Sequence, residues 1–253
     1  MNIVISGWPG AGSTTLAILL SYSLKIRLFR GSNTFRLLGQ KLNYGDQGTD
    51  RINADKILED HYGRIYDKYN VHVLEKYDNI VMETDYHVAS KKNNSKLVSY
   101  FLLCDFDARI KRLGIDSRDK DTLVLKEREN TLREKYKSLF NIDWFNHEHI
   151  KQQYDCLIDN SELAIYEELN IIYLDLLKRG FIDVNQYSNL INQSKSLEDM
   201  FWEKGKEYFF ILLSNEKLIV EAEEILKDIN IKFKKEINRI KNKTIKNLLL
   251  QFQ

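Results

Sequence analysis

Short apolar runs alternate with longer segments of helical periodicity over roughly the first 178 residues. The runs are rich in β-branched and aromatic residues and are bounded by Gly, Asn, Asp and Ser, as buried strands are. They predict about five strands, at 2–6, 26–30, 79–83, 97–104 and 155–160. The intervening segments predict helices, among them 16–24, 108–113 and 163–178. Strands that alternate with helices predict a parallel sheet covered by helices on both faces, which is the α/β class.

The pattern changes after Gly180. From 183 to 253 no apolar run is bounded by turns, and apolar residues recur at helical spacing over 201–213, 217–231 and 233–252. Apolar stripes of this kind need covering. We therefore divide the chain into a domain of residues 1–180 and a C-terminal all-helical extension of residues 181–253. We expect about three helices that dock on the first domain or on a second subunit of a homo-oligomer.

A glycine-rich segment joins the first strand to the first helix, and it reads Gly7-Trp8-Pro9-Gly10-Ala11-Gly12-Ser13-Thr14-Thr15. Glycines let backbone N–H groups point into such a turn, and the positive end of the following helix attracts phosphate. The spacing is that of the P-loop, G-x-x-x-x-G-K-[ST], which predicts an ATP-binding loop. We expect a hydroxyl to ligate Mg²⁺ at Thr14. The residues expected to bind ATP are Gly7, Gly10, Ala11, Gly12, Ser13, Thr14 and Thr15.

One position departs from the motif, because Ser13 stands where the P-loop has lysine. That lysine carries a charge that neutralises the β- and γ-phosphates, and serine carries none. The motif therefore predicts a phosphate-binding shape more firmly than it predicts catalysis, and a glycine-rich turn of another α/β protein is the alternative. In an enzyme we expect other cations to compensate, and the catalytic candidates are Arg118, Arg128 and Arg133.

Composition narrows the choice of partners. The chain of 253 residues is 43% hydrophobic and 30% charged with a net charge of +1, which makes no global electrostatic case for nucleic acid or membrane binding. The lysines of 232–246 surround Glu236, and we expect a solvated face there. Cys104 and Cys156 lie in separate apolar runs and predict buried thiols in a reducing compartment. We expect a cytoplasmic protein whose partners are small-molecule nucleotides.

Three histidines are candidate metal ligands: His87, His147 and His149. The last two are spaced by two residues, whereas ligands that share a helix face are spaced by four. We interpret all three as solvated loop residues.

Further stretches match a known family in order along the chain. Residues 31–36 read G-S-N-T-F-R, where that family has G-x-x-F-R, and 80–85 read I-V-M-E-T-D, where it has V-x-x-E-G-R. Within 128–161 the segments R-E-N-T, K-Y-K-S-L-F-N-I-D and Y-D-C-L-I-D-N-S match R-E-x-S, R-Y-x-x-x-Y-x-I-D and Y-D-x-V-I-x-T. Together with the P-loop they resemble the nucleoside monophosphate kinases, and most closely the archaeal-type cytidylate kinases, over roughly residues 1–178.

The resemblance implies a P-loop kinase three-layer fold, with an acceptor-binding region at about 31–77 and a lid at about 112–140. It implies that Arg36 contacts the monophosphate and that Asp67 accepts a hydrogen bond from the exocyclic amine of cytosine. Glu83 and Asp85 are expected at the acceptor, although Asp85 stands where the family has an arginine. Lys91 and Lys92 are possible substitutes for that cation.

A lid would exclude water from phosphoryl transfer, and arginines suit it because their planar forks bind phosphate. The arginines of the lid stretch are Arg112, Arg118, Arg128 and Arg133. The alternative for them is a solvated helix face with ion pairs such as Glu129–Arg133.

Three functions follow from these observations. The first is ATP- and Mg²⁺-dependent phosphorylation of a nucleoside monophosphate, CMP or dCMP, to the diphosphate and ADP. The second is a weak or inactive nucleotide-binding regulatory protein on a decayed kinase fold, which the residues Ser13 and Asp85 favour. The third is a kinase of another acceptor, such as a nucleoside or small metabolite, and the matched lid and tail segments argue against it. We favour the first.

Overall fold

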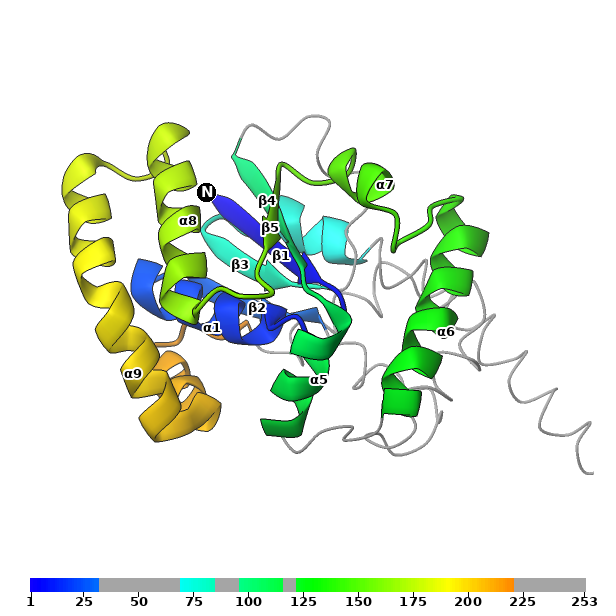
Figure 1. The fold of residues 1–253 in the computed structure, drawn as a ribbon. Coiled ribbons are helices and arrows are strands. Elements are labelled where there is room, and N and C mark those ends of the chain that lie inside the picture. The colour runs from blue at the N-terminus through cyan, green and yellow to red at the C-terminus, as the bar shows by residue number, and fades with distance from the viewer. Residues whose placement is uncertain (32–68, 85–95, 116–121, 221–253) are drawn as a thin grey trace, which may run out of the picture.

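The computed structural model describes residues 1–31, 69–84, 96–115 and 122–220. Five parallel strands form one sheet at its centre, in the order β2-β3-β1-β4-β5 (Figure 1). The strands are β1 (Asn2–Gly7), β2 (Arg27–Arg30), β3 (Ile80–Glu83), β4 (Leu97–Leu103) and β5 (Cys156–Asp159). The predicted α/β fold with its parallel sheet is confirmed, and the strand that leads into the P-loop lies in the middle of the sheet.

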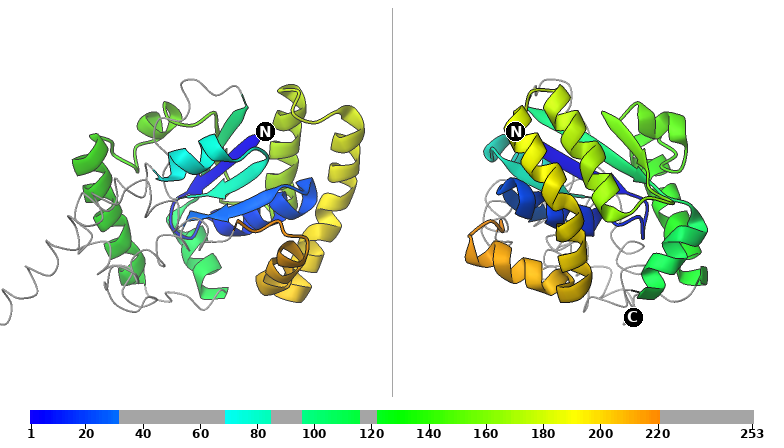
Figure 2. Two further views of the ribbon diagram at one scale, coloured as in Figure 1. Left: turned by 180° about the vertical axis from the view of Figure 1, so that it is seen from behind. Right: turned by 60° about the vertical axis from the view of Figure 1, so that its left-hand side comes forward.

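Helices lie on both faces of the sheet, so the molecule has three layers (Figures 1 and 2). Residues 69–76 are also helical. The helices with printed bounds are α1 (Ser13–Leu24), α5 (Phe106–Ile115), α6 (Thr122–Phe140), α7 (His147–Lys151), α8 (Ile165–Lys178) and α9 (Val184–Asn215).

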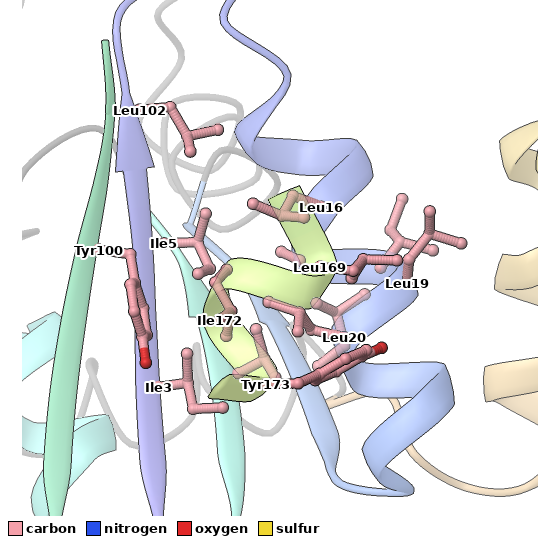
Figure 3. Packing of buried hydrophobic residues seen from close by; sticks show 14 of the residues in the cluster. Ile3, Ile5, Leu16, Leu19, Leu20, Tyr100, Leu102, Leu169, Ile172 and Tyr173 are labelled. Carbon is pink, nitrogen blue, oxygen red and sulfur yellow. The ribbon is translucent and has the colours of Figure 1, made fainter. Parts of the chain in front are cut away.

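The sheet is buried on both faces, which is why its strands are continuous apolar runs rather than alternating ones. On one face Ile3, Ile5, Tyr100 and Leu102 point toward α1 and α8 (Figure 3). On the other face Phe101 and neighbours from α6 and α7 form a second cluster. Its buried members are Phe101, Leu103, Leu132, Tyr136, Trp144, Ile150 and Tyr154.

Helix α9 forms an outer covering on α8 and α1 (Figure 1). It follows Gly180, whose φ of 72° ends the preceding helical segment, and it bends at Gly205, where φ is 76° and ψ is 169°. Its side chains Leu197, Phe201 and Phe209 are buried in the same apolar cluster as β1 and α1. The described part of the extension therefore docks on the first domain, which is one of the two alternatives predicted for it.

The helix predicted over 217–231 does not begin at residue 217. Lys217 has a φ of 56°, and the N–H of Leu218 donates to the Leu213 carbonyl at 2.8 Å, which closes α9. The chain then runs along the sheet edge, where Leu218 and Val220 exchange backbone hydrogen bonds with Leu28 of β2 at 2.6 and 2.9 Å. The open edge of β2 offers backbone partners that the helical pattern did not show.

The remainder of that predicted helix, and the whole of 233–252, lie outside the described residues. Among the helices that are described, none is both long enough and apolar enough to cross a bilayer.

Replacing Phe209 tests whether α9 belongs to the cooperative fold. The Phe209 ring is fully buried and meets Tyr22 of α1 edge-on, with ring centroids 5.2 Å apart. We expect Phe209→Ala to lower the free energy of unfolding by about 3–5 kcal/mol, because a buried aromatic side chain leaves a cavity. The measurement is urea denaturation followed by circular dichroism.

The neighbouring exposed residue provides the control, since Tyr208→Ala should change the unfolding free energy by less than about 1 kcal/mol. Equal, small effects of both variants would show that α9 folds independently of the sheet.

Candidate active site

The turn between β1 and α1 is shaped by three glycines. A Cβ on Gly7 would lie 2.9 Å from the Cβ of Leu102 on β4, so the turn starts where no side chain fits. Gly10 and Gly12 have φ values of 85° and 97°, a region that L-residues rarely adopt. Gly12 is the N-cap residue of α1, and no described side chain caps that helix end. The first backbone N–H groups of α1 are therefore available to an anion.

A hydroxyl and a carboxylate meet beside this turn. Thr14 donates from its Oγ1 to Oε1 of Glu83 at 3.3 Å. Glu83 ends β3, which neighbours β1, and only 4% of its surface is exposed. Hydroxyl and carboxylate oxygens are the donors that Mg²⁺ prefers, so the two side chains fit that ion.

Sequence reasoning predicted Thr14 as the metal ligand but assigned Glu83 to the acceptor. The sequence contained a basis for predicting the contact of Thr14 with Glu83, because the carboxyl ends of adjacent parallel strands share one edge of the sheet. The strand order was needed to show that β3 and β1 are adjacent.

Two arginines of α5 donate hydrogen bonds to backbone carbonyls of the turn. Arg109 is 4% exposed and donates to the Pro9 carbonyl at 3.2 Å and to the Cys104 carbonyl at 2.9 Å. Arg112 donates to the Ala11 carbonyl at 3.1 Å. Arg109 also forms an ion pair with Glu129 of α6. The alternative ion pair Glu129–Arg133 is thus not the one that forms, because Glu129 of α6 pairs with Arg109 of α5 and Arg133 pairs with Asp143.

The sequence interpretation did not single out Arg109. Its spacing of three from Arg112 places both guanidinium groups on one side of α5, and that was the available signal.

Asn160, directly after β5, holds the same turn from another side. Its Nδ2 donates to the Ala11 carbonyl at 2.8 Å, and its own carbonyl accepts from Arg112 Nη2 at 2.6 Å. Asn160 is fully buried. The Ala11 carbonyl thus receives two side-chain donors, one of them charged.

Aromatic contacts connect the turn to the segment after α6. Trp8 donates from Nε1 to the Trp144 carbonyl at 3.0 Å, and its ring stacks on Phe145 with centroids 5.5 Å apart. Arg133 of α6 lies over the Phe145 ring, 4.9 Å from its centroid, and pairs with Asp143 at 3.3 Å. Arg133 thus connects α6 to the same aromatic group.

The remaining predicted site residues divide into two groups. Ser13 and Thr15 lie half-buried in the first turn of α1, and Arg128 lies half-buried on α6. The others lie outside the described residues: Arg36, Asp67, Asp85, Lys91, Lys92 and Arg118.

Of the three histidines, His87 also lies outside the described residues. The His147 ring lies 5.4 Å from that of Trp8, and His149 Nδ1 accepts from the Asp143 N–H at 3.2 Å.

A buried carboxyl lies behind Asn160. Glu168, in the first turn of α8, has its pKa raised to about 7, chiefly by burial and further by Glu198, while Asn160 and Arg112 oppose the shift. This carboxyl changes charge near neutral pH, next to the residues that hold the turn.

Sequence comparison finds similar proteins in the archaea. The cytidylate kinase of Sulfolobus acidocaldarius is 26% identical over 185 residues, which cover 71% of this chain and 95% of that protein. The cytidylate kinase of Pyrobaculum islandicum is 29% identical over 176 residues, which cover 67% and 89%. Over most of their length, the archaeal cytidylate kinases are therefore proteins to which this chain is similar. No protein-family profile matches it.

Comparison with solved structures finds kinases at lower similarity. Shikimate kinase from Acinetobacter baumannii in complex with shikimate is 17% identical, with a TM-score of 0.47 over 70% of this chain and 93% of that one. Shikimate kinase from Bacteroides thetaiotaomicron is 15% identical, with a TM-score of 0.44 over 79% and 98%. Both TM-scores are below 0.5, so nothing about this site rests on them.

Glu168→Gln tests the raised pKa. Between the ordinary glutamate pKa of about 4.3 and the folded value of about 7, the folded protein keeps a proton that the unfolded chain releases. Glu168 therefore lowers stability as pH rises through this window. We expect Glu168→Gln to be about as stable as wild type near pH 4.5 and more stable, by on the order of 1–3 kcal/mol, at pH 8. Denaturation curves from pH 4.5 to 8 measure the difference, and a constant difference would contradict the assignment.

Proposed function

We propose that this protein transfers the γ-phosphoryl group of ATP to a nucleoside monophosphate, CMP or dCMP, giving the diphosphate and ADP. The observation that carries the proposal is the contact of Thr14 with Glu83 at the mouth of a P-loop, in a homologue of the cytidylate kinases. The choice of CMP or dCMP rests on the names of those relatives.

The turn binds the donor nucleotide by its backbone. The Ala11 N–H donates to the Trp8 carbonyl at 2.9 Å, so the phosphates would be met by the N–H groups from Gly12 to Thr15 and by the positive end of α1. Thr14 and Glu83 would hold Mg²⁺, which would offset the negative charge of the phosphates. The hydrogen bond between them sets the spacing of the two oxygens before any ion arrives.

The reaction needs no protein nucleophile. An oxygen of the acceptor phosphate forms a bond to the γ-phosphorus, and the bond from that phosphorus to the β–γ bridging oxygen breaks. ADP leaves with the electron pair of that bond. The protein contributes alignment and preorganised charge. We propose Arg118, Arg128 and Arg133 as the lid cations that act in this step.

The acceptor is proposed to lie along the carboxyl end of β3. Arg36, Asp67 and Asp85 are assigned to it together with Glu83, by the match to the relatives' motifs. The described residues support this position, because the chain there is fixed by a buried hydrogen bond. Asn70 donates to the Thr84 hydroxyl at 3.1 Å, and both side chains are buried. The helical segment 69–76 is thereby tied to the residue after Glu83.

We also propose that the chain has two parts, a kinase-like domain of residues 1–180 and a helical extension of residues 181–253.

A regulatory nucleotide-binding protein is the second candidate. Ser13 carries no charge at the lysine position of the motif, and Arg109 and Arg112 donate to carbonyl groups of the turn. A loop with this charge distribution binds phosphate through its backbone N–H groups. It stabilises the transition state of phosphoryl transfer less than a loop with the motif's lysine does.

An ADP-release assay with ATP, Mg²⁺ and a panel of nucleoside monophosphates separates the two functions. We expect turnover with CMP or dCMP, and a loss on the order of 10²–10³ in rate for Glu83→Gln, because a neutral amide would hold less firmly the Mg²⁺ that offsets the phosphate charge. Glu203→Gln, the same change at an exposed site of α9, is the control and should leave the rate unchanged. ATP binding without ADP release for any acceptor would favour the regulatory protein.

A pair of glycine variants tests the turn as the ATP site. Gly12 and Gly180 both have positive φ and open space where a Cβ would be, so alanine strains both backbones equally, by roughly 1–2 kcal/mol. We expect Gly12→Ala to weaken ATP binding more than about tenfold, which is 1.4 kcal/mol, and Gly180→Ala to leave it unchanged. Isothermal titration with ATP provides the measurement, and equal affinities in both variants would place the site elsewhere.

A further inference from the structure

The N-cap residue of helix α8 is Ala164, whose side chain cannot accept a hydrogen bond. Glu167 of the same helix accepts from the Ala164 N–H at 2.8 Å, but the N-cap side chain offers no acceptor to the N–H groups of the first turn. Glu198 of α9 supplies the missing acceptor, because its Oε1 accepts from the Ile165 N–H, in the first turn of α8, at 3.1 Å. The Glu198 carboxylate thus caps α8 from a different helix, and its negative charge favours the positive end of α8.

The position of Glu198 is fixed on several sides. The residue is 4% exposed, and its carboxylate also accepts from Lys195 at 2.8 Å and from Trp202 Nε1 at 3.4 Å. Burying a carboxylate is costly unless it is hydrogen-bonded, and these three donors provide the compensation.

A short chain of contacts leads from this cap to the P-loop. The Leu163 N–H, two residues before Ile165, donates to the Asn160 carbonyl at 3.3 Å. Asn160 in turn donates to the Ala11 carbonyl at 2.8 Å. Arg112 bridges the last two residues, since it donates to both of their carbonyls.

The peptide unit is planar, so the direction of the Ala11 carbonyl fixes the direction of the Gly12 N–H. That N–H belongs to the row that faces the nucleotide phosphates in the proposed function. The orientation of Asn160 therefore bears on phosphate affinity through one rigid peptide plane.

We propose that Glu198 is a positioning residue for the phosphate-binding loop, which it reaches by capping α8 and so fixing Asn160 against the Ala11 carbonyl. The inference rests on the proposed function, because it assigns ATP to that loop. It gives the helical extension a part in nucleotide binding although α9 itself does not contribute to the loop.

The test compares ATP affinity in variants of similar side-chain volume, measured by isothermal titration with ATP and Mg²⁺. Glu198→Met removes the acceptor for the Ile165 N–H and should raise the Kd for ATP about five- to tenfold. Glu198→Gln keeps an acceptor oxygen and should stay within about twofold of wild type. Asp199→Ala is the matched control, since Asp199 is the next residue, is exposed and pairs with the same lysine.

A double-mutant cycle separates positioning from general loss of structure. Asn160→Ala should weaken ATP binding, and adding Glu198→Met to it should cause little further loss, because both act through the same contact. Effects that multiply in the double variant would overturn the inference. Thermal melts confirm that each variant is folded at the assay temperature. If Glu198→Met does not fold, Glu198→Asp replaces it, because its shorter side chain withdraws the acceptor while keeping the charge.

The outcomes also distinguish the inference from the function on which it rests. Wild-type protein that binds ATP while Glu198→Met binds it equally well would overturn the inference alone. Wild-type protein that binds no ATP would overturn the proposed function and the inference with it.

Discussion

The carbonyl of Ala11 is the point on which the geometry of the phosphate-binding turn depends. It accepts hydrogen bonds from Asn160 and from Arg112, so a loop after β5 and a helix after β4 both fix its direction. On the opposite side, Gly7 lies against Leu102 of β4 with no room for a side chain. The turn is therefore held by the sheet before any ligand arrives, and its N–H groups need little reorganisation when phosphate binds.

The charges around the turn are largely compensated within the protein. Arg109 pairs with Glu129 of α6, and Arg112 lies near the buried Glu168. Ser13 adds no charge where the motif has lysine. In such a turn, affinity for an anion comes mainly from backbone dipoles and from the positive end of α1.

The extension is packed into the body as far as it is described. Phe209 and Leu213 share an apolar cluster with the sheet, and residues 218–220 pair with β2, the edge strand. Edge strands invite pairing with other chains, so this cover also protects the sheet. Arg30, the last residue of β2, lies over the Phe210 ring of α9, 4.4 Å from its centroid. The extension therefore contacts β2 both along its edge and at its C-terminal end.

Local patterns along the sequence determined the strands, their parallel pairing and the phosphate-binding turn. Continuous β-branched runs belong to strands buried on both faces, and the spacing of Gly7, Gly12 and Thr14 is a local property of one turn. The apolar stripe of α9 likewise predicted docking, because a helix face of that kind must be covered.

Only the tertiary structure decided which distant side chains meet. The order of the strands brings Glu83 next to Thr14. The positions of α5 and α6 let Glu129 form its ion pair with Arg109 rather than with Arg133. The meeting of Glu198 with Ile165 likewise depends on how α9 crosses α8, and the edge of β2 turned residues 217–220 from the predicted helix into an extended segment. These contacts join residues that no local period relates, because helical and strand periodicity specify which face is buried but not which neighbour covers it.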